Sequence, residues 1–304
     1  MFAPPEIIQA EVFASLPDEF RRVNEVAPWA AARRGGKPIH SFLEGPSFAR
    51  DGNLYVTDIP FGRIFRVTPA GQFELVAEYD GEPNGLKIHK DGRAFITDYK
   101  NGIVALDLKT GATRPALERR YSERFKGVND LFFAANGDMY FTDQGRTGHH
   151  DPTGRVYRWT ADGRLHCLLD NGLNPNGLVT NADESVLYVA MTNANAVWHL
   201  SLMPNDDVTA VGTFVQLSGG GGPDGMALTE DGGLVVAHAR LGAIWVFDAK
   251  GQPRWRVNSA ASDFVTNIAF GGPDMKTLYI TDAGAGVIQT ARLPVAGRAM
   301  YSHQ

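Results

Sequence analysis

Cysteine is almost absent from this 304-residue chain, which contains only Cys167. A single thiol cannot form an internal disulfide framework, so nothing in the sequence requires an oxidising compartment. The chain also lacks any run of about 18 apolar residues, the length that a membrane-spanning helix needs. Its first residues lack the basic stretch and apolar core of a secretory signal peptide. Together these absences predict a cytoplasmic protein.

The chain also lacks an excess of positive charge. The chain has 29 Lys and Arg against 34 Asp and Glu, which gives a net charge of -5. A nucleic-acid-binding protein needs a basic face to displace the counterions of phosphate groups. We therefore expect no nucleic-acid partner and no membrane partner, and we expect a small-molecule ligand. The oligomeric state is left open.

The chain does contain an internal repeat of about 40 to 50 residues, a period typical of propellers and solenoids. Three clear copies, RDGNLYVTD, KDGRAFITD and ANGDMYFTD, end at Asp58, Asp98 and Asp143. Three weaker copies cover residues 183–191, 230–238 and 274–282. Asp-Gly or Asn-Gly between apolar runs favours a tight hairpin turn, and a third and usually a fourth strand-like segment follow each copy. This pattern predicts an all-β, six-bladed β-propeller with four-stranded antiparallel blades.

The two ends of the chain complete this prediction. Six blades account for residues 40–293, but the sixth repeat stops after its third strand. Residues 8–16 resemble the fourth strands of other repeats, so we predict that they close the last blade. Residues 17–38 fit no blade and have a helix-forming composition with an acidic start, which predicts a short helical insertion. Whether this insertion covers the channel or packs on a second subunit stays open, and the whole chain is predicted to be a single domain.

An oxygen-bearing side chain recurs at the start of the first strand of every repeat. Because the innermost strands line the channel, these six positions should converge at one end of the axis. They are Glu44, Asn84, Asn129, Asn176, Asp224 and Asn267. Two carboxylates among amides suit a hard divalent cation, so Ca²⁺, Mg²⁺ or Mn²⁺ is favoured and Zn²⁺ is an alternative. Pro-Asn-Gly and Pro-Asp-Gly are also ordinary turn sequences, but their recurrence at matching positions favours a metal site.

Four of these motifs resemble the metal-binding signature of a known family. Glu-Gly-Pro, Asn-Asp, Pro-Asn-Gly and Pro-Asp-Gly, at Glu44, Asn129, Asn176 and Asp224, are similar to those of the gluconolactonase and senescence-marker-protein (regucalcin) family, which includes bacterial drug-responsive lactonases. The resemblance covers roughly residues 40–293. It implies a propeller with one catalytic divalent metal, often Ca²⁺, that hydrolyses lactones. These four residues would be the ligands, and Asp224 would also transfer protons.

Four further residues receive predicted roles from their positions in the repeats. Asn84 and Asn267 fall outside the family's four ligands, and we predict that they bind substrate or form hydrogen bonds to the ligands from behind. Asp130 is predicted to orient Asn129 from behind the metal. His238 stands at a strand end where other repeats have Asp, and it is predicted to face the substrate. Residue 131 is leucine where the sugar-lactone members carry glycine, which argues against a sugar lactone as substrate.

Two other functions are compatible with the same pattern. A phosphotriesterase could use a similar set of acidic and amide ligands to activate water against phosphorus. A propeller can also be a non-catalytic interaction module or a calcium-binding regulator, because a fold does not determine a function. A metal-dependent lactonase is the leading hypothesis.

Overall fold

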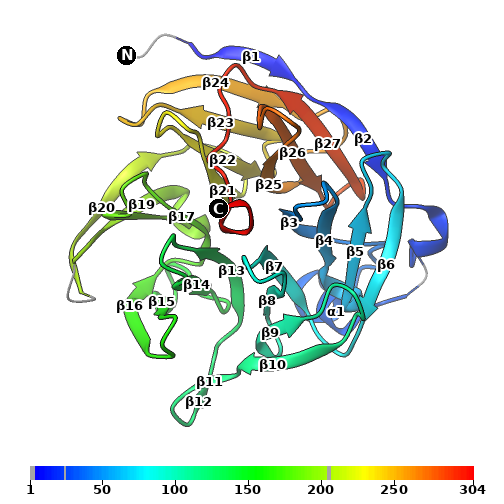
Figure 1. Cartoon of the computed structure of the whole chain (residues 1–304), viewed down its shortest axis with the longest axis horizontal. Helices are drawn as coiled ribbons and strands as arrows, with labels where there is room; N and C mark the ends of the chain where they lie inside the picture. The colour runs from blue at the N-terminus through cyan, green and yellow to red at the C-terminus, as the bar shows by residue number, and fades with distance from the viewer. Residues whose placement is uncertain (1–3, 24, 204–206) are drawn as a thin grey trace.

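Six small sheets form a ring around a central axis (Figure 1) in the computed structural model, which describes residues 4–23, 25–203 and 207–304. Within each sheet, strands that follow one another in the chain are hydrogen-bonded neighbours, and they run antiparallel from the axis to the rim. The prediction of an all-β, six-bladed propeller is therefore confirmed.

The blades follow one another in chain order. Blade 1 contains β3 (Leu43–Phe48), β4 (Leu54–Asp58), β5 (Arg63–Val67) and β6 (Phe73–Glu78); blade 2 contains β7 (Pro83–Ile88), β8 (Ala94–Asp98), β9 (Gly102–Leu106) and β10 (Thr113–Leu117). Blade 3 contains β13 (Val128–Phe133), β14 (Met139–Asp143), β15 (Gly154–Trp159) and β16 (Leu165–Gly172); blade 4 contains β17 (Pro175–Thr180), β18 (Val186–Met191), β19 (Ala196–Leu202) and β20 (Val208–Gln216). Blade 5 contains β21 (Gly222–Leu228), β22 (Leu234–Ala239), β23 (Ala243–Phe247) and β24 (Pro253–Asn258); blade 6 contains β25 (Val265–Gly271), β26 (Thr277–Asp282) and β27 (Val287–Arg292).

Short elements lie between the blades. The strands β11 (Arg119–Arg120) and β12 (Glu123–Arg124) form a hairpin that projects from the rim (Figure 1). The 3-10 turns η2 (Ile59–Phe61) and η3 (Thr192–Ala194) follow the second strands of blades 1 and 4. No helix in the described ranges is long and apolar enough to cross a membrane.

Both faces of a blade are buried, which explains why the second strands are apolar at consecutive positions. In blade 1, Leu54 and Val56 pack toward blade 6 with Ile288. Tyr55, between them, points the other way and packs with Leu86 of blade 2. Successive side chains of a strand point to opposite faces, so each blade contributes to two neighbouring apolar layers.

The N-terminal segment adds two outer strands. β2 (Glu11–Ser15) pairs antiparallel with β27 and completes blade 6, as predicted. β1 (Glu6–Gln9) instead pairs parallel with β24 and adds a fifth strand to blade 5. The predicted closing strand, residues 8–16, therefore begins too early, since Ile8 lies opposite Val257. One continuous apolar segment serves two neighbouring blade edges, and its sequence alone does not show where it changes partner.

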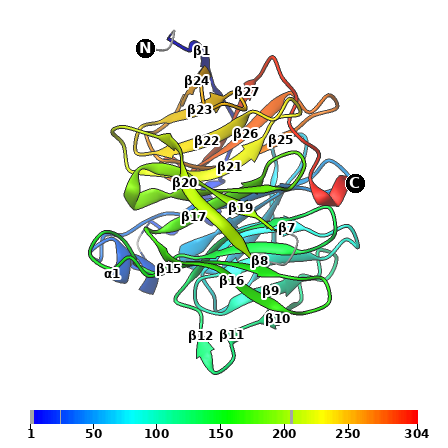
Figure 2. The same cartoon turned by 90° about the vertical axis from the view of Figure 1, so that its left-hand side faces the viewer.

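The segment predicted as a helical insertion, residues 17–38, contains η1 (Asp18–Phe20) and α1 (Pro28–Arg33). Trp29 of α1 is buried against Phe42, which lies just before β3. Figure 2 shows α1 on one face of the disc and the C-terminus on the opposite face.

The chain after β27 crosses the axis on the face opposite to α1, and we call residues 294–304 the C-terminal tail (Figures 1 and 2). It ends in η4 (Tyr301–His303). The tail contacts all six blades. Its Ser302 contacts Arg50 of blade 1, and its Tyr301 contacts His89 of blade 2 and Phe133 of blade 3. Its Arg298 contacts Asn181 of blade 4, and its Gly297 contacts Thr229 of blade 5 and Met275 of blade 6. The tail thus closes one end of the channel.

Candidate metal and active site

Each inner strand carries a bulge near its start, at the end of the channel on the α1 face. In blade 2, Pro83 lies opposite Asp98 and Leu86 lies opposite Ile96, so two residues, Asn84 and Gly85, occupy the bulge. The other five blades have a register shift at the same place, except that in blade 1 Glu44 still pairs with Thr57 and the shift follows it. A bulge changes the direction of the side chains that it contains, and here it points them toward the axis.

The first bulge positions form what we call the slot. Its members are Glu44, Asn84, Asn129, Asn176, Asp224 and Thr266, and all six side chains are buried. In blade 6, Val265 lies opposite Asp282, which puts Thr266 in the slot and Asn267 one residue further along. The prediction that Asn267 is equivalent to the other five residues is therefore wrong, because a sequence motif does not show the register of the strand pairing.

The second bulge position is glycine in four blades. It is Asp130 in blade 3 and Asn267 in blade 6, and these two blades face each other across the axis. Asn267 Nδ2 donates hydrogen bonds to Asp130 Oδ2 (3.2 Å) and to Glu44 Oε2 (2.9 Å). A Cβ on Gly85 would lie 2.5 Å from Asp130 Oδ1, and one on Gly225 would lie 2.1 Å from Asn267 Oδ1. The glycines therefore leave the space that this cross-channel pair occupies beside the slot.

This pairing changes the role predicted for Asp130. Its Oδ1 accepts a hydrogen bond from the Leu131 amide (2.8 Å), and its Oδ2 accepts the one from Asn267. No hydrogen bond joins Asp130 to Asn129. Asp130 thus orients Asn267, and through it Glu44, and does not orient Asn129 as predicted.

Threonine hydroxyls attach the slot backbone of one blade to the blade before it. Thr57 Oγ1 of blade 1 donates to the carbonyl oxygen of Asn84 (2.6 Å), and Thr142 Oγ1 of blade 3 donates to that of Asn176 (2.9 Å). These threonines are the penultimate residues of the repeated sequences LYVTD and MYFTD. The recurring hairpin sequence therefore positions the slot residue of the next blade.

Three buried carboxylates lie close together around the slot. Burial and repulsion from Asp130 raise the pKa of Glu44 to about 8. Burial, followed by repulsion from Glu44 and Asp130, raises the pKa of Asp224 well above its usual value. The ammonium group of Lys87 acts in the opposite direction on Glu44 and Asp130. When all three carboxylates are ionised, they and the ammonium group carry two net negative charges, which is the amount that one divalent cation would balance.

Lys87 was not predicted as a site residue. It lies three residues after Asn84 on β7, and its Nζ approaches the carbonyl oxygen of Pro46 at 3.5 Å. The sequence does contain a signal, because a lysine among the apolar residues of an inner strand is unusual. The contact with Pro46 and the electrostatic effect on Glu44 and Asp130 place its ammonium group beside the slot.

The donor set in the slot fits a hard cation. Asn84 Oδ1 and Asn176 Oδ1 are buried and accept no hydrogen bond from the described part of the chain. Such an orphaned acceptor costs about 1–3 kcal/mol, and a hard cation would satisfy it. No group of three or more His, Cys, Asp or Glu in the described ranges is arranged to hold a metal ion. A site here would therefore use the carboxylates of Glu44 and Asp224 together with amide oxygens, the kind of ligand set that Ca²⁺ accepts.

His238, predicted to face the substrate, is fully buried in blade 5. Its Nδ1 accepts a hydrogen bond from Trp245 Nε1 (3.2 Å), and its Nε2 lies 3.0 Å from the carbonyl oxygen of Gly219. Neither ring nitrogen is available to a substrate in this arrangement.

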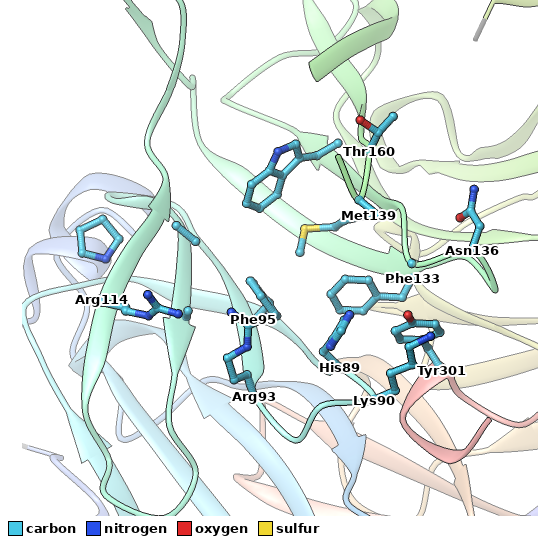
Figure 3. A pocket seen from close by; sticks show the side chains of 16 residues that line it. His89, Lys90, Arg93, Phe95, Arg114, Phe133, Asn136, Met139, Thr160 and Tyr301 are labelled. Atoms are coloured by element: carbon cyan, nitrogen blue, oxygen red, sulfur yellow. The ribbon is translucent and has the colours of Figure 1, made fainter. Parts of the chain in front are cut away.

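A separate cavity of about 590 Å³ opens between blades 2 and 3 on the face of the C-terminal tail. Aromatic residues, among them Phe133 and Tyr301, and basic residues line it (Figure 3). Asp91 pairs with both Arg93 and His89, so part of its basic lining is already neutralised. No slot residue borders this cavity.

The fold and the slot together define a class of proteins: six-bladed propellers that gather acidic and amide side chains at one end of the channel. The chain belongs to the family described as SMP-30/Gluconolactonase/LRE-like region, whose model matches residues 42–284 and so includes the whole slot.

Two similar curated proteins carry the name Lactonase drp35. The one from Staphylococcus aureus (strain MRSA252) is 32% identical over 240 residues, which cover 74% of this chain and 71% of that protein. The one from Staphylococcus epidermidis (strain ATCC 12228) is 33% identical over 224 residues, which cover 69% and 67%.

Solved structures support the fold alone, because their sequence identity is low. Regucalcin from Agrobacterium tumefaciens, described as a calcium-binding protein, has a TM-score of 0.77 and 19% identity over 99% of this chain and 100% of its own. A gluconolactonase from Xanthomonas campestris has a TM-score of 0.75 and 19% identity over 97% and 99%.

Proposed function

We propose that this protein is a metal-dependent lactonase that binds one divalent cation in the slot, with Ca²⁺ as the first candidate and Mn²⁺, Mg²⁺ and Zn²⁺ as alternatives. The observation that carries the proposal is the buried cluster of three carboxylates with one ammonium group, beside the Asn84 and Asn176 amide oxygens, which accept no hydrogen bond from the residues that the structure describes. The relatives named lactonase support the choice of reaction. The substrate would be a small-molecule lactone.

Four slot residues would hold the cation: Glu44, Asn129, Asn176 and Asp224. When bound, the cation would act as a Lewis acid that polarises the lactone carbonyl. Asn84 also lies in the slot and would orient the substrate with its side-chain amide. Asn267 fixes the position of the Glu44 carboxylate through its hydrogen bond.

Asp224 would move the proton. A water molecule adds to the carbonyl carbon, and its proton passes to the Asp224 carboxylate. The bond between that carbon and the ring oxygen then breaks, and Asp224 returns the proton to the leaving oxygen. The product is a hydroxy acid. To act as the base, Asp224 needs one carboxylate oxygen that is not committed to the cation.

Asp224→Asn tests this assignment. The amide cannot accept the proton, so we expect hydrolysis of γ- and δ-lactones to fall by at least about 100-fold, the lower range for general-base catalysis. A pH-indicator assay of metal-stripped protein, with each cation added back, measures the rate. Asp170→Asn makes the same chemical change at an exposed site and should leave the rate unchanged. A fully active Asp224→Asn protein would remove Asp224 from the mechanism.

Cation binding can be measured without any substrate. A ligand that binds only the folded state raises the unfolding temperature by mass action. We therefore expect Ca²⁺ to stabilise the wild-type protein in thermal unfolding, and to stabilise Asp224→Asn less. No stabilisation by any of the four cations would contradict a metal site. Tight binding with faster hydrolysis of paraoxon than of lactones would favour a phosphotriesterase.

A further inference from the structure

Two arginines lie together on the slot-bearing face without an acidic partner. Arg34 ends α1, and Arg240 follows β22 of blade 5. Both guanidinium groups lie over the ring of Phe264, with Cζ 4.7 Å from its centroid for Arg34 and 3.9 Å for Arg240. Within the described ranges, neither side chain forms a hydrogen bond or a salt bridge.

This arrangement is electrostatically unfavourable in the free protein. Burial, and then repulsion from Arg240, lower the pKa of the half-buried Arg34. Arg240 also has a backbone φ of 63°, in the left-handed region that residues other than glycine rarely occupy. Strained residues of this kind are often found at binding sites. A bound anion would neutralise the two like charges.

The arginines border a cavity of about 320 Å³. Its charged residues are Arg34, Lys37, Arg240 and Asp263, which leave two positive charges. His40 also lines it, and burial followed by repulsion from Arg21 lowers the pKa of that imidazole. The cavity thus presents a positive surface next to an aromatic ring.

Two residues that line the cavity are close in sequence to slot residues or their neighbours. Phe264 is two residues before Thr266 of the slot. Arg240 is two residues after His238, which pairs with Pro223 beside Asp224. Residues next to the strands of blades 5 and 6, among them Arg240, Phe264 and Ala283, line this cavity, and no slot residue borders it.

We propose that Arg34 and Arg240 bind a carboxylate on the substrate, so that the preferred substrates are lactones with a carboxylate-bearing side chain. This inference rests on the proposed lactonase function. Guanidinium groups form paired, charge-assisted hydrogen bonds with carboxylates. The Arg34 side chain is half-buried and Arg240 is exposed, so a ligand can reach both. The neutral part of the lactone would occupy the slot.

A matched pair of substrates tests the preference. The probes are 3-(5-oxotetrahydrofuran-2-yl)propanoate and its propanamide, which differ in charge but share the ring. We expect kcat/KM to favour the carboxylate, and Arg34→Gln or Arg240→Gln to reduce that preference about tenfold each, mainly through KM. Arg114→Gln, at an exposed arginine on the other face, is the control. Equal rates for both substrates, or an unchanged preference in both slot-face variants, would overturn the proposal.

A binding measurement separates this inference from the proposed reaction. Isothermal titration of Asp224→Asn protein with the carboxylate requires no turnover. We expect binding that weakens about tenfold when Arg240→Gln is added. This result would support the anion site even if wild-type protein opened no lactone. Equal affinity for carboxylate and amide would overturn the anion site even if the lactonase assay succeeded.

Discussion

His238 shows how two hydrogen bonds determine the protonation state of a single residue. Because Trp245 Nε1 donates to Nδ1, the ring proton is on Nε2, which donates to the carbonyl oxygen of Gly219. A second proton on Nδ1 would face the indole N–H. Burial of the ring, the largest effect, and repulsion from Arg256 accordingly lower the pKa of His238.

This residue should make stability depend on pH. The unfolded imidazole titrates near 6.5 and the folded one below it, so the unfolded state binds the proton first as the pH falls. The contribution of His238 is thus fully present above pH 6.5 and decreases below it. We expect His238→Gln to lose less stability than wild type between pH 7.5 and 5.5, measured by urea unfolding. His149→Gln, in an exposed loop, should behave like wild type, and equal slopes for all three proteins would contradict this account.

At the scale of elements, β2 closes the ring by joining the first segment of the chain to the last blade. Its inward side chains, Ala14 and the following Leu16, are buried with Phe65 of blade 1 and Ile288 of blade 6. The Leu16 amide also donates to the carbonyl oxygen of Gly286 (3.0 Å). The outward Val12 is 47% exposed.

Truncating an inward side chain of this segment should therefore lower the free energy of unfolding much more than truncating an outward one. We expect Leu16→Ala to lower the free energy of unfolding by about 2–5 kcal/mol, as for other buried leucines. Val12→Ala should change it by less than about 0.5 kcal/mol. Urea unfolding measures both. Similar losses for the two variants would mean that β2 does not close the blade in solution.

At the scale of the whole molecule, the C-terminal tail and the slot occupy opposite ends of the channel. Tyr301 stacks on Phe133 with centroids 5.4 Å apart and is buried. Arg298 donates to the carbonyl oxygen of Asn181 (2.9 Å) in blade 4. The tail therefore joins blades that share no strand, and it does so far from the proposed chemistry.

A substitution in the tail should therefore reduce stability without reducing activity. We expect Tyr301→Ala to lower the free energy of unfolding by about 3–5 kcal/mol, the range for large buried aromatics. Metal binding and lactone hydrolysis at 25 °C should stay within about twofold of wild type, since the rings that Tyr301 contacts, His89 and Phe133, are not slot residues. Tyr121→Ala, at an 87% exposed tyrosine, controls for the loss of a ring. A large loss of metal affinity would show that the tail also shapes the slot.

The hairpins, the number of blades and most slot residues could be predicted from the sequence, because each depends on residues close together in the chain. Each hairpin depends on its own Asp-Gly or Asn-Gly turn and its own apolar alternation, so the number of blades follows from counting repeats. Glu44, Asn84, Asn129, Asn176 and Asp224 were found because each stands at the start of an inner strand. Local patterns of this kind are present in the sequence before the chain folds.

Contacts between distant segments decided the rest. Asn267 bonds Glu44 across 223 residues, and strand register, which no motif contains, separates Asn267 from the slot. Four other features likewise depend on closure of the ring: the hydrogen bond from Asn267 to Asp130, the position of Lys87 beside the carboxylates, the parallel pairing of β1, and the proximity of Arg34 to Arg240. The sequence by itself determined the repeating unit and most of the oxygen-bearing residues of the slot. Only the tertiary structure decided how their charges meet, because electrostatic energy depends on distances and burial that exist only once six blades surround one axis.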